Sequence, residues 1–311
     1  MNQVYRYKAI SKQSFHQRMD RLMQLRGQTL LLLPIIEELR EEHPEVGARQ
    51  LYYMIKPTAM GRDGFEQLCF ENGFKLKRRK AYKTTTDSRG VIRFPNLLAG
   101  QQFTAVNQGW SSDITYYQIR QSYYYLTLII DVFSRVIVGY SVSRRLLTEH
   151  TTVPALKMAL RQRRPDQGLI FHSDAGGQYY SKEFLELTQV NRIKNSMCEV
   201  AWENPYSERI NGTIKNQYLK GYNPQSFVSL VSMTKRAINN YNQVRPHQSL
   251  KNMTPKNFES SLPAGGSCFT KDNLCTSRNI TRLEKKDHPL KNRSIPLVKT
   301  TKSVEKTVNV Y

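Results

Sequence analysis

Two carboxylates, one expected at the end of a strand and one at the start of a helix, constrain this chain more than any other feature. The apolar run 169–171 is followed by Asp174 and a Gly-Gly turn, a pattern typical of a buried strand whose carboxyl end lies at a site. Further along, Asn204 and Pro205 suit the N-cap and the first position of a helix. Glu208 then falls in its first turn, where the helix dipole favours the ionised form. The intervening segment has room for a helix and a second strand.

Composition indicates a folded protein that binds a polyanion. The 311 residues are enough for two domains, and 39% hydrophobic with 10% aromatic residues indicate a folded chain. The net charge of +22 is large for an ordinary enzyme. A solvated basic surface would explain it, but nucleic acid as a partner explains it more simply.

Cysteine and hydropathy patterns give no sign of a zinc site or a membrane span. None of the four cysteines forms a CxxC pair, and the histidines are scattered. The most apolar run, residues 30–36, is too short to cross a bilayer, and no signal peptide is evident. We therefore predict reduced thiols, no membrane association, and a cytoplasmic, nucleoid-associated location.

The first 83 residues are predicted to form a helical DNA-binding region. Helices are expected over 29–42, where Pro34 marks an interruption or a late start, and over 45–55 and 61–73. The last two resemble a helix-turn-helix unit, although a plain helical domain would give the same pattern. A basic run follows that suits phosphate contacts, or else is only a solvated arm; it contains Lys75, Lys77, Arg78, Arg79 and Lys80.

Residues 84–108 lack periodicity and are predicted to be a linker, and residues 109–259 are predicted to form an α/β domain. Three closely spaced strands indicate an antiparallel meander, and alternating helices and strands then complete a mixed five-stranded sheet flanked by helices. The predicted strands are 110–117, 123–130, 136–142, one ending near 173, and 193–197; the predicted helices are 148–163, 182–190, 205–220 and 225–243. Residues 260–311 are predicted to be a basic, flexible tail.

Asp113 lies within a predicted strand and adds a third carboxylate to Asp174 and Glu208. A buried carboxylate is costly unless it is paired or bound to a metal. Each acid alone is more often structural, but two Asp and one Glu without Cys or clustered His favour Mg²⁺ or Mn²⁺. Two such ions can activate a nucleophile and stabilise a leaving oxygen in phosphoryl transfer.

At these residues the sequence resembles the D-D-E catalytic core of insertion-sequence transposases, of the second-reading-frame type, which is similar to that of retroviral integrases. The matching motifs, in order, are Trp110-x-x-Asp113-Ile114-Thr115-Tyr116, Asp131-x-Phe133-Ser134-Arg135, His172-Ser173-Asp174-x-Gly176-x-Gln178-Tyr179, Asn204-Pro205-x-x-Glu208 with Lys215, and Tyr241-Asn242-x-x-Arg245-Pro246-His247. The resemblance spans residues 44–259 and implies a ribonuclease-H-like fold. It also implies that Asp113, Asp174 and Glu208 bind the metals.

The sequence departs from the family pattern around the second spacer. Thirty-three residues separate Asp174 from Glu208, where 35 is usual, and Glu203 replaces a common Asp. The loop after Met197 is also shortened. These changes bear on the path into the Glu208 helix rather than on the role of Glu208.

Three further residues have open or alternative roles. Asp131 competes with Asp113 as the first catalytic acid, but its setting between two strands favours a turn and a hydrogen-bonded cap. His172 either orients Asp174, contacts DNA or is a satisfied core histidine. Lys215 lies seven residues after Glu208, on the same helix face, and is predicted to contact a DNA phosphate.

The resemblance implies a DNA transposase that cuts the terminal repeats of a mobile element and joins the 3′-hydroxyl to target DNA. It also implies two metal ions, a homo-oligomer on paired ends and, as in many members of this kind, action together with an upstream-frame protein. The alternatives are a nuclease of the same fold without joining activity, and a DNA-binding protein that has lost catalysis.

Overall fold

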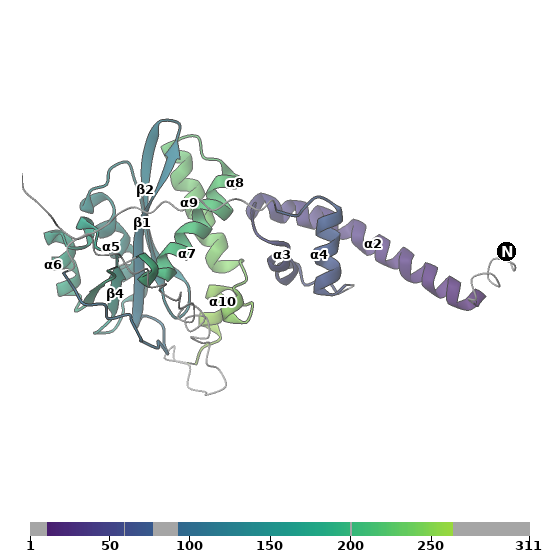
Figure 1. The fold of residues 1–311 in the computed structure, drawn as a ribbon, viewed down its shortest axis with the longest axis horizontal. Helices are drawn as coiled ribbons and strands as arrows, with labels where there is room; N and C mark the ends of the chain where they lie inside the picture. Colours follow the sequence, from purple (N-terminus) through teal and green to yellow (C-terminus); the bar gives the residue numbers. More distant parts are fainter. Residues whose placement is uncertain (1–10, 59, 77–92, 200, 264–311) are drawn as a thin grey trace, which may run out of the picture. The chain divides into compact units, whose positions relative to one another are not determined.

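The N-terminal region is built from three helices that share one small core. The structure, a computed structural model, describes residues 11–58, 60–76, 93–199 and 201–263. The helices are α2 (Lys12–Glu42), α3 (Ala48–Ile55) and α4 (Arg62–Glu71) (Figure 1). Their facing apolar side chains form a buried cluster of Leu32, Ile36, Val46, Leu51, Phe65, Leu68 and Cys69. The prediction of a small helical region before the sheet is therefore confirmed.

The first helix, α2, runs through Pro34, so both alternatives predicted there, an interruption and a late start, are wrong. Proline lacks the N–H that would donate to the carbonyl of Leu30, which ordinarily costs the helix about 3 kcal/mol. Leu30 is 62% exposed, so water is available near the helix surface at this turn. On the opposite side, Leu32 and Ile36 are buried in the helical core and hold the backbone on both sides of Pro34.

The second part of the chain is organised around a mixed five-stranded sheet. Its strands are β1 (Gly109–Ile119), β2 (Ser122–Asp131), β3 (Ile137–Ser143), β4 (Ile170–Ser173) and β5 (Lys194–Met197). The spatial order is β3-β2-β1-β4-β5. The first three strands form an antiparallel meander, and β4 and β5 run parallel to β1. This topology confirms the predicted ribonuclease-H-like fold.

Helices cover both faces of the sheet (Figure 1). On one face α5 (Thr152–Arg163) and α6 (Lys182–Val190) pack over Trp110, Ile129 and Phe171. On the other, α7 (Pro205–Thr213) and α9 (Phe227–Gln243) pack over Leu126 and Leu128. Successive residues of β2 therefore enter different cores, as the alternation of side chains along a strand requires.

The structure refines two of the predicted helices and adds one that was not predicted. A short 3₁₀ turn, η1 (Thr148–His150), precedes α5. The helix predicted over 205–220 is α7 followed by a π-helical segment, η4 (Ile214–Leu219), and by α8 (Lys220–Tyr222). A helix that was not predicted, α10 (Pro255–Ser260), closes the described chain, and Glu259 in it forms a 2.6 Å ion pair with Arg163 of α5. None of the described helices is long and apolar enough to span a bilayer.

Gly139 sets the distance between β3 and α5, which gives a test of the packing. A Cβ at this position would lie 2.8 Å from the Cβ of Ala159 and would overlap the carbonyl oxygen of Ala155. We expect Gly139→Ala to lower the free energy of unfolding by about 1–3 kcal/mol, the usual cost of overpacking a core. Urea denaturation would measure the change. Gly27→Ala is the control, since nothing lies within 4 Å of a Cβ there; equal effects of the two variants would contradict the packing argument.

Candidate active site

The three predicted acids lie on two neighbouring strands and one helix near the middle of the sheet. Asp113 is on β1, Asp174 directly follows the carboxyl end of β4, and Glu208 is in the first turn of α7. Because β1 and β4 run parallel, with Ser111 opposite His172, Asp113 and Asp174 lie at the same level of the sheet. Asp113 and Asp174 are half-buried, whereas Glu208 is exposed.

Asp113 and Asp174 are electrostatically coupled. Burial, and then the charge of Asp174, raise the pKa of Asp113 to about 7; the charge of Glu208 acts in the same direction, and the hydrogen bond from Asn211 opposes the shift. Burial also raises the pKa of Asp174, and a hydrogen bond from the Gly176 N–H opposes that shift. Two neighbouring carboxylates that resist ionisation are typical of a site that takes a cation.

The carboxylates do not form a closed metal site by themselves. Among the residues that the structure describes, no three His, Cys, Asp or Glu side chains lie close enough together to hold a metal ion. The hydrogen bonds to Asp113 and Asp174 come from an amide side chain and a backbone N–H, so their carboxylate oxygens are the donor atoms that a cation would meet. Such a donor set fits a hard divalent cation such as Mg²⁺ or Mn²⁺.

A side-chain clamp fixes the start of α7 to β1. The side chain of Asn204 accepts a 2.6 Å hydrogen bond from the Ser111 hydroxyl and donates a 3.0 Å bond to the carbonyl of Ser112. The Ser111 hydroxyl also contacts that of Ser207. Asn204 is the N-cap residue, but its side chain makes no capping bond within the helix. The sequence pattern predicts the helix start correctly but does not predict that the Asn204 side chain fixes α7 to β1. This attachment holds Glu208 near Asp113.

Asn211 lies one turn after Glu208 and forms a second connection between α7 and the acid pair. Its Nδ2 donates a 2.9 Å hydrogen bond to Oδ2 of Asp113, and its buried Oδ1 has no hydrogen-bond partner. Asn211 lies three residues after Glu208, on the same face of α7. The helix that carries Glu208 therefore also contacts the first aspartate directly.

Gly176 allows the Asp174 turn to close tightly. Its N–H donates a 3.1 Å hydrogen bond to Oδ1 of Asp174, and a Cβ on Gly176 would lie 3.0 Å from that oxygen. Beneath the turn, the hydroxyl of the buried Tyr179 hydrogen bonds to that of Ser112, 2.9 Å away. The bond from the Gly176 N–H orients the Asp174 carboxylate, and the Tyr179 bond supports the neighbouring part of β1.

Lys215 lies beside Asp113 rather than in open solvent. Its ammonium group donates a 3.1 Å hydrogen bond to the Thr115 hydroxyl and lies 4.6 Å from the ring centroid of Tyr116. Burial lowers the pKa of Lys215, and the charge of Asp113 opposes that shift. The predicted contact of Lys215 with a DNA phosphate stays a prediction.

The other candidate residues have structural surroundings. Asp131 is fully buried, and its carboxylate accepts hydrogen bonds from the backbone N–H groups of Asn107, Phe133 and Ser134 at 2.6–3.0 Å. This agrees with the turn-forming role predicted for it. His172 is also fully buried and contacts the Ser196 hydroxyl through Nδ1, while its Nε2 has no partner.

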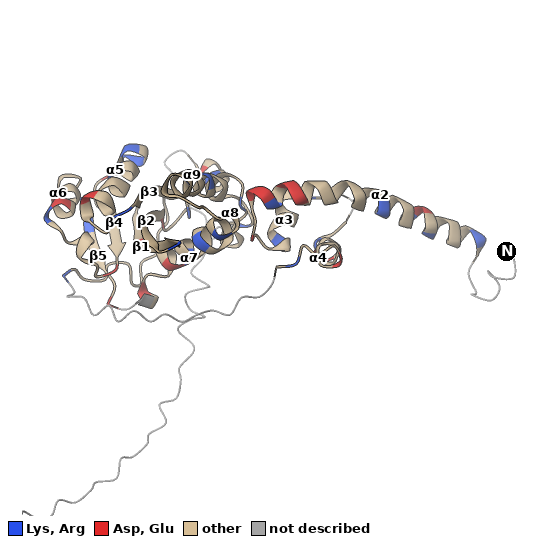
Figure 2. Ribbon diagram, turned by 90° about the horizontal axis from the view of Figure 1, so that it is seen from above, with Lys and Arg blue, Asp and Glu red and all other residues tan. Residues whose placement is uncertain are grey.

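Of the predicted DNA-binding run, the structure describes only Lys75, which is exposed and lies 4.4 Å from the ring centroid of Phe70. Lys77, Arg78, Arg79 and Lys80 lie outside the described residues. Within the described part, lysine and arginine residues occur both in the helical region and in the helices around the sheet (Figure 2).

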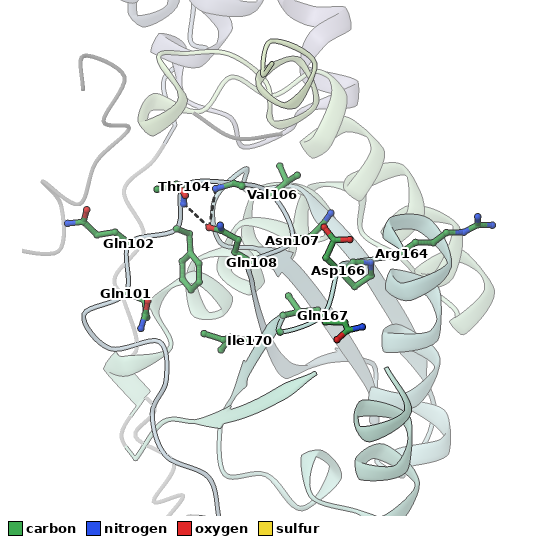
Figure 3. A pocket seen from close by; sticks show the side chains of 15 residues that line it. Gln101, Gln102, Thr104, Val106, Asn107, Gln108, Arg164, Asp166, Gln167 and Ile170 are labelled. Atoms are coloured by element: carbon green, nitrogen blue, oxygen red, sulfur yellow. Dashed lines mark hydrogen bonds between the residues drawn. The ribbon is translucent and has the colours of Figure 1, made fainter. Parts of the chain in front are cut away.

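A cavity of about 530 Å³ lies away from these acids. Segments 101–108 and 164–170 line it, next to the ends at which β1 and β4 begin, and none of the three acids contributes to it (Figure 3). Inside it, the Gln108 side chain accepts hydrogen bonds from the N–H groups of Thr104 and Ala105. That contact shapes the loop that leads into β1.

Asn204 offers a test of how strongly the clamp positions the site. We expect Asn204→Ala to lower the free energy of unfolding by about 1–3 kcal/mol, because it leaves a buried hydroxyl and carbonyl with fewer partners. It should also reduce the rate of DNA cleavage per folded molecule. Asn191→Ala is a matched control, since it removes a side-chain bond to the carbonyl of Leu187 at the end of α6. An unchanged rate in Asn204→Ala would show that the clamp is not needed for positioning.

Comparison with known proteins places the chain in a family. Residues 104–201 and residues 191–255 each match the Integrase core domain. An uncharacterized 31 kDa protein of insertion element IS600 from Shigella sonnei is 35% identical over 205 residues, which cover 64% of this chain and 75% of that protein. The transposase InsF of insertion sequence IS3A from Escherichia coli K12 is 31% identical, over 58% of this chain and 64% of InsF.

Solved structures of retroviral integrases are also similar. The HTLV-2 integrase catalytic core, in complex with magnesium, is 25% identical with a TM-score of 0.40, covering 49% of this chain and 94% of that one. A simian T-cell lymphotropic virus intasome chain is 18% identical with a TM-score of 0.46, covering 68% and 71%.

The sheet topology and the paired carboxylates define an integrase-type core. The chain belongs to the insertion-element transposases with an integrase core domain, the IS3 type that includes InsF. The family predicted from the sequence motifs is thereby confirmed.

Proposed function

We propose that this protein binds the terminal repeats of its insertion element, hydrolyses a phosphodiester bond at each end, and joins the freed 3′-hydroxyl to target DNA. In the first step a water oxygen bonds to phosphorus and the 3′ oxygen leaves. In the second step the 3′-hydroxyl oxygen loses its proton and bonds to the phosphorus of a target phosphodiester, and the 3′ oxygen of the target at that phosphorus leaves and takes up a proton. The placement of Asp113 and Asp174 at the same level of two neighbouring parallel strands, next to the helix of Glu208, is the observation that supports this proposal most directly.

Asp113, Asp174 and Glu208 would hold Mg²⁺ or Mn²⁺, as two ions. Such ions supply Lewis-acid stabilisation of the attacking and leaving oxygens. The chain's own part is to hold the carboxylates: the Asn204 clamp fixes α7 against β1, Asn211 orients Asp113, and the Gly176 N–H orients Asp174. Glu208, which is exposed in the first turn of α7, would complete the set of carboxylate ligands.

We further propose which segments of the chain bind DNA and which carry the catalytic residues. Residues 1–83 would bind the DNA ends, and 84–108 would link them to the catalytic region 109–259. The flexible tail predicted over 260–311 lies outside the described residues from 264 on. The protein would act in the cytoplasm at the nucleoid, as a homo-oligomer on paired ends and with an upstream-frame protein.

A joining assay tests the proposed activity. Full-length protein is incubated with a linear DNA that carries the element's own terminal repeat with a free 3′-hydroxyl, a circular target plasmid, and Mg²⁺ or Mn²⁺. We expect covalent joining products that depend on the cation. Cleavage of uncut ends without joining of pre-cut ends would identify a nuclease of the same fold. Specific DNA binding without either reaction would identify a protein that has lost catalysis.

The basic run gives a separate test of DNA binding. We expect affinity for DNA to fall steeply with salt, because each neutralised phosphate adds about −0.9 to the slope of log affinity against log salt. Replacing Lys77, Arg78, Arg79 and Lys80 together by alanine should make that slope less steep, by up to about four times the contribution of one phosphate contact. Titrations by fluorescence anisotropy at several salt concentrations measure it. An unchanged slope would show that this run does not contact DNA.

A further inference from the structure

An exposed pair of tyrosines lies next to the acid pair and has no role in the chemistry above. Tyr116 on β1 and Tyr123 on β2 are 53% and 51% exposed, and their ring centroids lie 5.7 Å apart in an edge-to-face arrangement. Gln118 is the direct cross-strand neighbour of Tyr123, so Tyr116 and Tyr123 are diagonal neighbours on one face of the hairpin. Large exposed aromatic side chains in a polar setting are typical of binding surfaces.

On the β4 side, the edge of β1 near Tyr116 is open, which here means that it has no strand partner among the described residues. β4 pairs with β1 only as far as Ser111, and within the described residues no strand pairs with β1 beyond that point on this side. In Figure 1 the β1–β2 hairpin extends well past the short β4. Asp113 lies where this open edge begins and Tyr116 lies three residues further along it. Tyr116 is therefore reached from Asp113 along the part of β1 that has no strand partner on the β4 side, and Tyr123 lies behind Tyr116 on β2.

Lys215 connects the tyrosine pair to the acid pair. Asp113 and Thr115 project to the α7 face of β1, whereas Tyr116 projects to the opposite face. The Lys215 ammonium group contacts both the Thr115 hydroxyl and the Tyr116 ring, so it reaches across the open edge. An ammonium group has three donors, and the hydroxyl and the ring use two of them. A further donor remains for a phosphate beside Asp113.

We propose that Tyr116 and Tyr123 form a stacking platform for an unpaired base at the end of the DNA strand whose phosphodiester lies at Asp113. Lys215 holds the phosphate next to that base. Aromatic side chains beside a cation are the usual means of holding a single strand without reading its sequence. The inference rests on the proposed function, and it adds that the enzyme engages a frayed end rather than a fully paired duplex.

The test compares two probes that differ only in the bases of the single-stranded part. One is a short duplex with a 3′ overhang of thymidines, and the other carries the same overhang with abasic residues. Full-length protein is titrated with each probe in EDTA, so that cleavage does not change the DNA. We expect wild type to bind the thymidine overhang at least about fivefold more tightly, the fold-change for the lower value of about 1 kcal/mol per stacked base.

The variants assign that preference to the rings. Tyr116→Ala and Tyr123→Ala should each reduce the preference, and Tyr116→Phe, which keeps the ring, should retain it. Gln118→Ala alters an exposed neighbour on the same face and should leave the preference unchanged. Thermal melting of each variant shows whether loss of the contact between Tyr116 and Tyr123 lowers stability.

Three outcomes would overturn the platform. The first is equal affinity of wild type for both probes. The second is a Tyr116→Ala variant that weakens binding of both probes by the same factor. The third is a set of alanine variants that keep the preference and lose only self-association, which would assign the tyrosines to contact with a second copy. Failure of the joining assay with an intact base preference would overturn the proposed function alone, because the binding test needs neither the acids nor a metal.

Discussion

Asp113→Asn, Asp174→Asn and Glu208→Gln will each reduce DNA cleavage and joining by a factor on the order of 10²–10³, while DNA binding survives. The expected size follows from losses seen when a preorganised electrostatic group is removed from an active site. The amides keep the shape of the side chains but lose the charge that holds a divalent cation. In Asp113→Asn the new amide oxygen would still accept the hydrogen bond from Asn211, so the local structure should persist.

Matched controls separate this effect from a general loss of charge. Glu186→Gln removes a carboxylate that is 61% exposed on α6, and its activity should equal that of wild type. Asp131→Asn tests the rival first acid. It should lower stability, because Asp131 accepts three backbone hydrogen bonds in a buried turn, and the protein that still folds should keep its activity. Near-normal magnesium-dependent joining by any of the three site variants would remove that residue from the catalytic set.

Much of the fold follows from local patterns in the sequence. The strands and helices of the core were predictable because alternating apolar residues and well-placed Asn, Pro and Gly agree with the final structure there. The prediction at Pro34 failed because packing outweighed the local rule that proline interrupts a helix. Buried Leu32 and Ile36 hold the helix together on both sides of the proline. The π-helical segment after Thr213 has no comparable local signal, since its register depends on how Ile214, Tyr218 and Leu219 fill the core.

The sequence predicts the acids of the candidate site but not their supporting contacts. Motifs that occur in order along the chain indicate Asp113, Asp174 and Glu208, and their catalytic role stays a prediction. The clamp by Asn204 is not predicted, because a side chain at an N-cap position ordinarily bonds to its own helix, and only the crossing of α7 over β1 brings the backbone and hydroxyls of 111–112 within reach. The pairing of Tyr116 with its neighbour on β2 likewise depends on strand register, which the sequence alone leaves open.

The final expected result concerns stability against pH in the metal-free protein. The pKa of Asp113 is about 7 in the folded state and 3.8 as the ordinary value for the unfolded chain. Between those values the folded state binds more protons, so the free energy of unfolding should fall as pH rises from about 4 to 7. At about 1.36 kcal/mol per pKa unit, the loss amounts to about 4 kcal/mol by neutral pH. The raised pKa of Asp174 acts in the same direction.

Asp113→Asn removes the titrating group and should flatten this dependence. At pH 7 and above the variant should be more stable than wild type by up to about 4 kcal/mol without a divalent cation, and below about pH 4 the two should converge.

Manganese should stabilise wild type and have a smaller effect on the Asp113→Asn variant. A cation that binds only the folded state adds stability in proportion to the logarithm of its concentration over its dissociation constant. Urea denaturation across about pH 4–8, with and without manganese, measures both effects. Asp166→Asn, which removes an exposed carboxylate away from the site, should follow the wild-type curve. If Asp113→Asn also followed it, Asp113 would be ionised at neutral pH without a cation, and the acid pair would exert no repulsion for a metal to relieve.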